Sequence, residues 1–289
     1  MRKRCMAVLT ALTLVVGMIG CGGNEGFQAA EEISVITRED GSGTRGAFIE
    51  LFGIEKKNEE GTKIDYTTDA ASITNSTSVM MTTVESDLHA IGYISLGSLN
   101  GTVKAVKIDG ATPNVENIKN GSYSIFRPFN IAVKEGLSDV AQDFVNYILS
   151  KEGQAVIEKS GYIMVSENGA FTSNGASGKI TVAGSSSVSP VMQKLKEAYL
   201  AVNGNAEIEI LTSDSSTGMS NAIEGICDIG MASRAVKDSE KEKGLKEITI
   251  ANDGVAVIVN KENPVEDMSK EMVEQIYTGE VTSWSGIIK

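Results

Sequence analysis

Three segments of this chain share one pattern, in which a short apolar strand enters a turn rich in glycine and hydroxyl side chains and a helix follows. Strands are expected at 33–37, 180–183 and 207–211, and the helices after them at 47–52, 188–202 and 219–224. Strands that alternate with helices are typical of α/β folds. Each turn also places free backbone N–H groups at the positive end of a helix dipole, where anions bind. The pattern therefore predicts an α/β fold with several anion-binding turns.

The first turn carries the most chemistry. Ser42 and Thr44 offer hydroxyl groups, and the glycine on either side of Ser42 frees the backbone for close contact. Arg38, just upstream, adds a forked and permanently charged donor. We expect Asp40 to hold the Arg38 guanidinium in place. A plain Gly-rich turn with a surface arginine is the alternative reading of this segment alone.

The other two turns repeat the arrangement with different residues. Residues 184–187 read Gly-Ser-Ser-Ser, and Ser189 followed by Pro190 is expected to cap the next helix. Residues 213–218 form the third turn. A further buried strand, 228–232, ends in a polar pair. Helix capping alone is the alternative explanation for these serines.

The sequence favours binding over catalysis. It shows no Ser-His-Asp set, no Cys-His pair and no cluster of metal ligands, so neither a metal nor a cofactor is expected. The single histidine, His89, has no second His or Cys nearby. Cys227 stands in an apolar setting and is expected to be a small core residue.

The N-terminus predicts export. A basic start precedes an apolar run too short to span a bilayer, so residues 1–20 are expected to be a signal peptide. The run ends in Met-Ile-Gly-Cys, which resembles a bacterial lipobox, and Cys21 would then carry lipid, with residues 21–32 as a tether. A plain secretory signal is the alternative.

Charge excludes one class of partner. Residues 1–20 hold three of the 26 Lys and Arg and none of the 38 Asp and Glu, so the formal charge of −12 would become about −15 after cleavage. Nucleic acid is therefore not expected as a partner, because binding its phosphate backbone requires clustered positive charge.

Linked motifs along the chain resemble the phosphate-binding subunit of bacterial phosphate-specific ABC importers, a periplasmic-binding-protein-like family. The matching segments are residues 36–48 (ITREDGSGTRGAF), 90–97, 150–162, 180–199, 213–219 (SDSSTGM), 228–234 (DIGMASR) and 277–287 (YTGEVTSWSGI). Their order differs from the family's, because residues 33–166 resemble its second half and 180–289 its first. The chain therefore reads as a circular permutation.

The resemblance implies a type II fold, with two α/β lobes of mixed sheets joined by two hinge strands and a ligand cleft between them. One lobe is expected to be continuous over 127–258, with a new linker at 166–179, and the other to be split into 33–126 and 259–289. Permutation is tolerated where chain ends lie close together at exposed loops. A fragment of a longer tandem chain and a swapped dimer are the alternatives.

Carried over position by position, the resemblance implies a set of site residues. The phosphate-binding residues would be Arg38, Ser42, Gly43, Thr44, Ser186, Ser187, Ser215 and Ser233, and the supporting ones Asp40, Arg45, Ser185, Ser216 and Arg234. Ser233 departs from the family, whose well-known members have an aspartate there that accepts a proton from phosphate. Arg234 could add a second cation or pair with an acidic neighbour.

The implied function is that of an extracytoplasmic, lipid-anchored solute-binding protein, not an enzyme, that captures phosphate and delivers it to an ABC permease. Ser233 keeps open a binder of another tetrahedral oxyanion, sulfate or molybdate. A phosphate sensor or adhesion lipoprotein and, with less support, a phosphate-handling hydrolase are the remaining alternatives.

Overall fold

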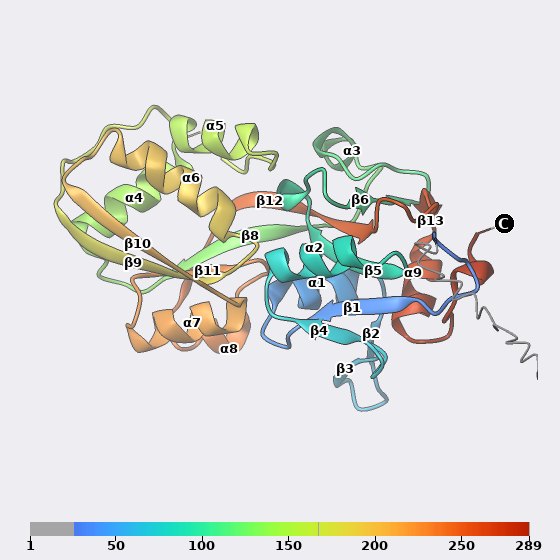
Figure 1. Ribbon diagram of the computed structural model, residues 1–289. Coiled ribbons are helices and arrows are strands. Elements are labelled where there is room, and N and C mark those ends of the chain that lie inside the picture. Colours follow the sequence, from blue (N-terminus) through green and yellow to red (C-terminus); the bar gives the residue numbers. More distant parts are fainter. Residues whose placement is uncertain (1–25, 167, 289) are drawn as a thin grey trace, which may run out of the picture.

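The computed structural model describes residues 26–166 and 168–288, which fold into two bodies joined by long strands (Figure 1). The predicted signal peptide and the lipidated Cys21 lie outside the described residues and stay predictions. Within the described residues, none of the helices is both long enough and apolar enough to span a membrane.

Two separate cores define the bodies. The first core gathers buried residues from 33 to 125 together with others from 255 to 284, among them Phe48, Tyr93 and Trp284. The second core and a smaller cluster beside it hold buried residues from 129 to 251. We call the bodies around them lobe A and lobe B. Lobe A is thus built from both ends of the described chain.

A mixed sheet runs through both lobes in the order β10-β9-β11-β8-β12-β5-β1-β4. The strands are β1 (Ser34–Arg38), β2 (Glu55–Lys57), β3 (Lys63–Asp65), β4 (Ser72–Thr74), β5 (Ala90–Ser95), β6 (Lys104–Ala105), β7 (Lys107–Ile108), β8 (Phe126–Val133), β9 (Gly178–Ser185), β10 (Ala206–Ser213), β11 (Ile229–Ala232), β12 (Lys246–Val259) and β13 (Asp267–Met268). The helices are α1 (Gly43–Leu51), α2 (Thr77–Ser86), α3 (Val115–Lys119), α4 (Asp139–Leu149), α5 (Lys151–Lys159), α6 (Ser189–Leu200), α7 (Ser215–Glu224), α8 (Asp238–Lys241) and α9 (Lys270–Tyr277), with short 3₁₀ turns at Leu96–Ser98 and Trp284–Gly286.

Two antiparallel strands, β8 and β12, connect the lobes. β12 pairs with β8 over residues 246–254 and with β5 of lobe A over 255–259. Ile250 and Ala251 pack in the second core, whereas Val255 to Val259 pack in the first. The expected boundary at residue 258 therefore lies within a strand, on the side of lobe A.

The helices at the first and third turns begin earlier than the sequence predicted. α1 starts at Gly43 and α7 at Ser215, so the polar turn residues themselves form the first helical turn. The reason is capping: Ser42 accepts a hydrogen bond from the N–H of Arg45, and Asp214 accepts one from the N–H of Thr217. Burial disfavours a charged Asp214, but the bonds from Thr217 hold the pKa of this carboxyl below its usual range.

The predicted cap at the second turn was wrong. Val188 occupies the N-cap of α6 and makes no side-chain cap bond, while Ser189 is already helical and donates from Oγ to the Ser185 carbonyl. Pro190 lies in the first turn, where its missing N–H costs nothing.

The first and last described segments lie side by side in lobe A. The N–H of Ile33 donates to the carbonyl of Thr282 at 2.8 Å, and Glu32 forms an antiparallel bridge with Ser283. Phe27 stacks on His89, whose backbone carbonyl accepts a bond from Trp284 Nε1. The segments around residues 32–33 and 282–283 are therefore neighbours in the fold.

Candidate functional site

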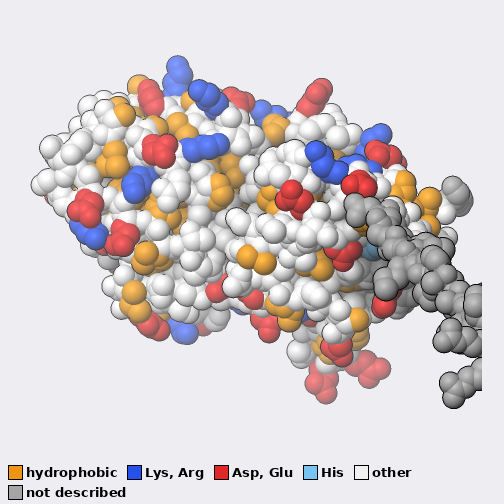
Figure 2. Space-filling view, viewed as in Figure 1, with side chains coloured by type: hydrophobic (Ala, Val, Ile, Leu, Met, Phe, Trp, Pro, Cys, Tyr) orange, Lys and Arg blue, Asp and Glu red, His pale blue; other side chains and the backbone are white. Residues whose placement is uncertain are grey.

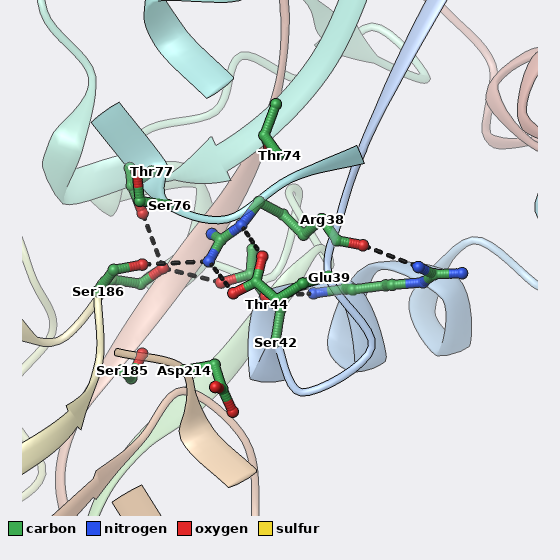
Figure 3. Close-up of polar contacts among 12 residues, drawn as sticks. Arg38, Glu39, Ser42, Thr44, Thr74, Ser76, Thr77, Ser185, Ser186 and Asp214 are labelled. Atoms are coloured by element: carbon green, nitrogen blue, oxygen red, sulfur yellow. Dashed lines mark hydrogen bonds and ion pairs between the residues drawn. The ribbon is translucent and has the colours of Figure 1, made fainter. Parts of the chain in front are cut away.

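The N-termini of α1 and α2 from lobe A meet those of α6 and α7 from lobe B between the lobes (Figure 3). Each of these four helices comes directly after a strand of the sheet: α1 after β1, α2 after β4, α6 after β9 and α7 after β10. Free N–H groups and positive dipole ends at four helix starts make an environment that favours an anion.

Buried hydroxyl groups from both lobes contact one another here. The Thr44 and Ser187 oxygens are 2.8 Å apart, and Thr77 Oγ1 lies 3.2 Å from Ser187 Oγ. Ser233 Oγ lies 3.5 Å from Thr44 and 3.4 Å from Ser215. All five side chains are buried. We call Thr44, Thr77, Ser187, Ser215 and Ser233 the hydroxyl cluster.

Arg38 ends β1 beside this cluster and is 2 % exposed. Its Nη2 donates to Ser186 Oγ at 3.1 Å, which joins the two lobes. Its Nε and Nη2 also donate to the two carboxylate oxygens of Glu39, at 2.8 and 2.7 Å. The backbone N–H of Arg38 donates to the hydroxyl of Tyr93, so both its main chain and its side chain are fixed.

The expected role of Asp40 was wrong. Its side chain is 96 % exposed and pairs with Arg45 at 3.0 Å, and Glu39 holds Arg38 instead. Arg45 also pairs with Asp65 and donates to the carbonyl of Arg38, so it braces the end of β1.

Two glycines let the lobes touch. A Cβ on Gly43 would lie 2.5 Å from Ser215 Oγ and 2.9 Å from Ser233 Oγ, and one on Gly41 would lie 2.3 Å from Asp214 Oδ1. Such distances are shorter than real Cβ contacts, so a side chain at either position would force the facing side chains or the lobes to shift. The Gly41 carbonyl also accepts a bond from the N–H of Ser216 at 3.2 Å.

The remaining supporting residues lie around the cluster. Ser185, buried, ends β9 and accepts the bond from Ser189. Of the two roles left open for Arg234, the structure shows the pairing one: its guanidinium binds both carboxylate oxygens of Glu240, at 2.9 and 2.8 Å. Its Nη2 also reaches Ser216 Oγ at 3.4 Å.

The sequence analysis missed Thr77 and Glu39. Thr77 opens α2, where Ser76 accepts the capping bond from Val79, and the strand β4 lies just before. Residues 72–86 are thus a fourth strand-turn-helix unit, and the Asn-Ser-Thr-Ser turn was the signal that could have revealed it. Glu39 carried no comparable signal.

The described part of the chain offers little for a metal site or a cysteine nucleophile. No group of three His, Cys, Asp or Glu side chains in residues 26–166 and 168–288 could hold a metal ion. Burial raises the pKa of the Cys227 thiol to about 11, which makes it a poor nucleophile at neutral pH.

Comparison with known proteins agrees with this architecture. The profile of the PBP superfamily domain matches residues 24–152 and 169–286. The phosphate-binding protein PstS 2 of Streptococcus agalactiae is 54% identical over 293 residues, which cover 100% of both chains. This chain belongs to the phosphate-binding-protein family of the PBP superfamily. A crystal structure of a phosphate-binding protein of a phosphate ABC transporter from Streptococcus pneumoniae TIGR4 has 43% identity and a TM-score of 0.69, and covers 89% of this chain and 100% of that one.

Other members of the family match over a shorter stretch. The phosphate-binding protein PstS of Staphylococcus aureus USA300 is 35% identical over 127 residues, which cover 42% of this chain and 39% of that protein. The streptococcal relative therefore aligns with this chain from end to end, whereas the staphylococcal match covers less than half of either chain.

Proposed function

We propose that the protein binds inorganic phosphate between lobes A and B and delivers it to the membrane permease of an ABC importer. The observation that carries this proposal is the meeting of Arg38 and the hydroxyl cluster, from both lobes, at four helix N-termini. The site offers many donors and one forked cation, which suits an oxyanion. The names of the full-length relatives point the same way.

The energy required is within reach of such a site. Micromolar binding needs about 8 kcal/mol. Four to six hydrogen bonds to a charged ligand, at roughly 1.5–3 kcal/mol each before the costs of association, supply that amount. No covalent step is needed, and the protein acts as a carrier on the extracytoplasmic face.

The protein surface fits a small anion better than a polyanion. Figure 2 shows acidic and basic side chains scattered over one face rather than gathered by sign, and the chain carries a formal charge of −12. At physiological salt the Debye length is about 8 Å, so the helix dipoles and Arg38 at the site outweigh distant surface charge.

Titration of the protein from residue 22 onward with phosphate and with sulfate tests the proposal. We expect one phosphate per monomer with micromolar or tighter affinity, measured by calorimetry, and the sulfate titration shows whether the site also accepts a fully ionised anion. Ser233 is the reason for the sulfate arm, because a serine accepts a hydrogen bond without repelling a fully ionised anion. Equal affinities would favour a general oxyanion binder, and no heat from either anion would overturn the proposal.

We also propose that the lobes arise from a circularly permuted order. Two observations support this: the staphylococcal match covers less than half of each chain, as a reordered chain would produce, and Ile33 lies against Thr282. Residues 166–179 would be the new linker and lobe A the divided one.

A chain reopened in the linker and rejoined from residue 288 to residue 33 tests this order. We expect the reopened chain to be monomeric and folded. Its affinity for phosphate should be within about threefold of that of the unmodified protein, because the contacts within and between the lobes are kept. A reopened chain that folds only as a dimer would favour the swapped arrangement over the permuted one.

A further inference from the structure

A second buried guanidinium lies beside the site at the crossing between the lobes. Arg127 on β8 faces Asp253 on β12 in register, and these residues are 3 % and 1 % exposed. Arg127 uses two of its nitrogens on a single oxygen: Nε and Nη2 donate to Asp253 Oδ2 at 3.3 and 3.1 Å. Arg127 Nη1 is buried and has no hydrogen-bond partner within the described part of the chain.

Only one carboxylate oxygen of Asp253 contacts Arg127. Its other oxygen, Oδ1, accepts bonds from Ser95 Oγ at 2.8 Å and from the N–H of Gly97 at 3.5 Å. Burial raises the pKa of Asp253 to about 6 even though the charge of Arg127 opposes that rise. A buried cation with one free donor and a shared counter-ion remains able to attract another anion.

The position of Arg127 connects it to the site already described. It lines an interlobe groove of about 980 Å³ together with Ser42, Ser216 and Arg234. Arg38 and the hydroxyl cluster do not line this groove, which borders the site at Ser42 and Ser216. Burial lowers the pKa of Arg127, and the positive charge of Arg38 lowers it further, so the two guanidiniums repel each other. An anion held near both would relieve that repulsion.

We propose that Arg127 is a specificity-determining residue of the anion site, whose charge, added to that of Arg38, makes the site prefer a doubly charged oxyanion to a singly charged one. The inference rests on the proposed function, because it concerns the same anion. The Nη1 of Arg127 is a buried donor that no group in the described residues satisfies. Each added cation attracts a dianion about twice as strongly as a monoanion at the same distance.

A purely structural role is the competing explanation. The pair could serve only to tie β8 to β12, and removing either partner would then weaken the fold and the site alike. The titratable groups that act on Arg127 are Asp253, Arg38 and Tyr162. Burial raises the pKa of Tyr162, so this side chain stays neutral between pH 6 and pH 8.5. The two roles predict opposite changes in phosphate affinity when Asp253 alone loses its charge. Affinity rises if Arg127 attracts the anion and falls if the pair only holds the strands together.

The test compares two variants of the protein from residue 22 onward. Arg127→Gln with Asp253→Asn removes both charges and keeps polar side chains of similar size, whereas Asp253→Asn alone leaves the Arg127 charge without a counter-ion. The affinity for phosphate is measured by calorimetry at pH 6 and at pH 8.5, where phosphate is mainly singly and mainly doubly charged. The unmodified protein keeps the Asp253 carboxyl, whose pKa is about 6. The two variants, which lack it, are therefore also compared directly with each other at each pH.

We expect the double variant to bind phosphate at least tenfold more weakly than the unmodified protein at pH 8.5 and less than threefold more weakly at pH 6. Asp253→Asn alone should bind at least threefold more tightly at pH 8.5. Lys119→Gln with Glu158→Gln, which removes an exposed ion pair, is the matched control and should change neither value.

Other outcomes overturn the inference. Variants that change affinity in the same direction and by the same factor at both pH values would assign the pair a structural role. If the double variant does not fold, Asp253→Asn alone decides, and unchanged or weaker binding at pH 8.5 contradicts the inference. If the unmodified protein binds no phosphate, the proposed function and this inference fail together, whereas normal binding with unaffected variants overturns the inference alone.

Discussion

Replacing Gly43 by alanine should weaken phosphate binding by on the order of a hundredfold while the protein stays folded. The added Cβ would lie 2.5 Å from Ser215 Oγ and 2.9 Å from Ser233 Oγ, and because both serines are buried in the hydroxyl cluster, we expect lobes A and B to move apart. Separating them removes bonds that each contribute roughly 1.5–3 kcal/mol to a charged ligand, and the loss of about 3 kcal/mol corresponds to that factor.

Gly46 provides a matched control in the same helix. Nothing lies within 4 Å of a Cβ built on it, and it sits in the interior of α1. Gly46→Ala should leave the affinity unchanged and raise the free energy of unfolding by about 0.5–1 kcal/mol, since alanine favours a helix. Calorimetry gives the affinities and urea unfolding the stabilities. Binding by Gly43→Ala within threefold of the unmodified protein would show that the bound state does not need this close approach.

Replacing Arg38 by alanine should weaken phosphate binding by at least tenfold, which corresponds to about 1.4 kcal/mol or more. Arg38 is the buried cation that joins β1 of lobe A to Ser186 of lobe B. Its removal takes away a charge-assisted, forked donor and leaves Glu39, 23% exposed at its side chain, without its partner beside an anion. Both changes act against binding.

Two further variants separate charge from geometry. Arg38→Lys keeps the charge but loses the fork, so its affinity should lie between those of alanine and arginine. Lys63→Gln removes the same charge from an exposed side chain and should change affinity less than twofold. If Arg38→Ala and Lys63→Gln bind phosphate equally well, Arg38 does not contact the anion.

The local parts of the site could be predicted from the sequence, and the pairings within it could not. The strands and turns around Arg38, Ser187 and Ser215 follow from apolar runs and hydroxyl-rich turns that involve neighbouring residues. The partner of Arg38 does not: Glu39 and Asp40 are adjacent acids, and only the folded chain shows that the second turns to solvent. Capping failed as a guide at Ser189 because the hydroxyl of a first-turn serine can bond back to the preceding turn.

Local patterns in the chain were enough to predict an α/β fold with several hydroxyl-rich helix starts, because a turn, a cap and a helix dipole depend on residues close together in the chain. Which of these helix starts meet depends on how the whole chain folds. Thr44 and Ser187, 143 positions apart, lie 2.8 Å from each other because β8 and β12 bring the lobes together and Gly41 and Gly43 let them touch. Such contacts depend on the path of the whole sheet, which no local pattern contains.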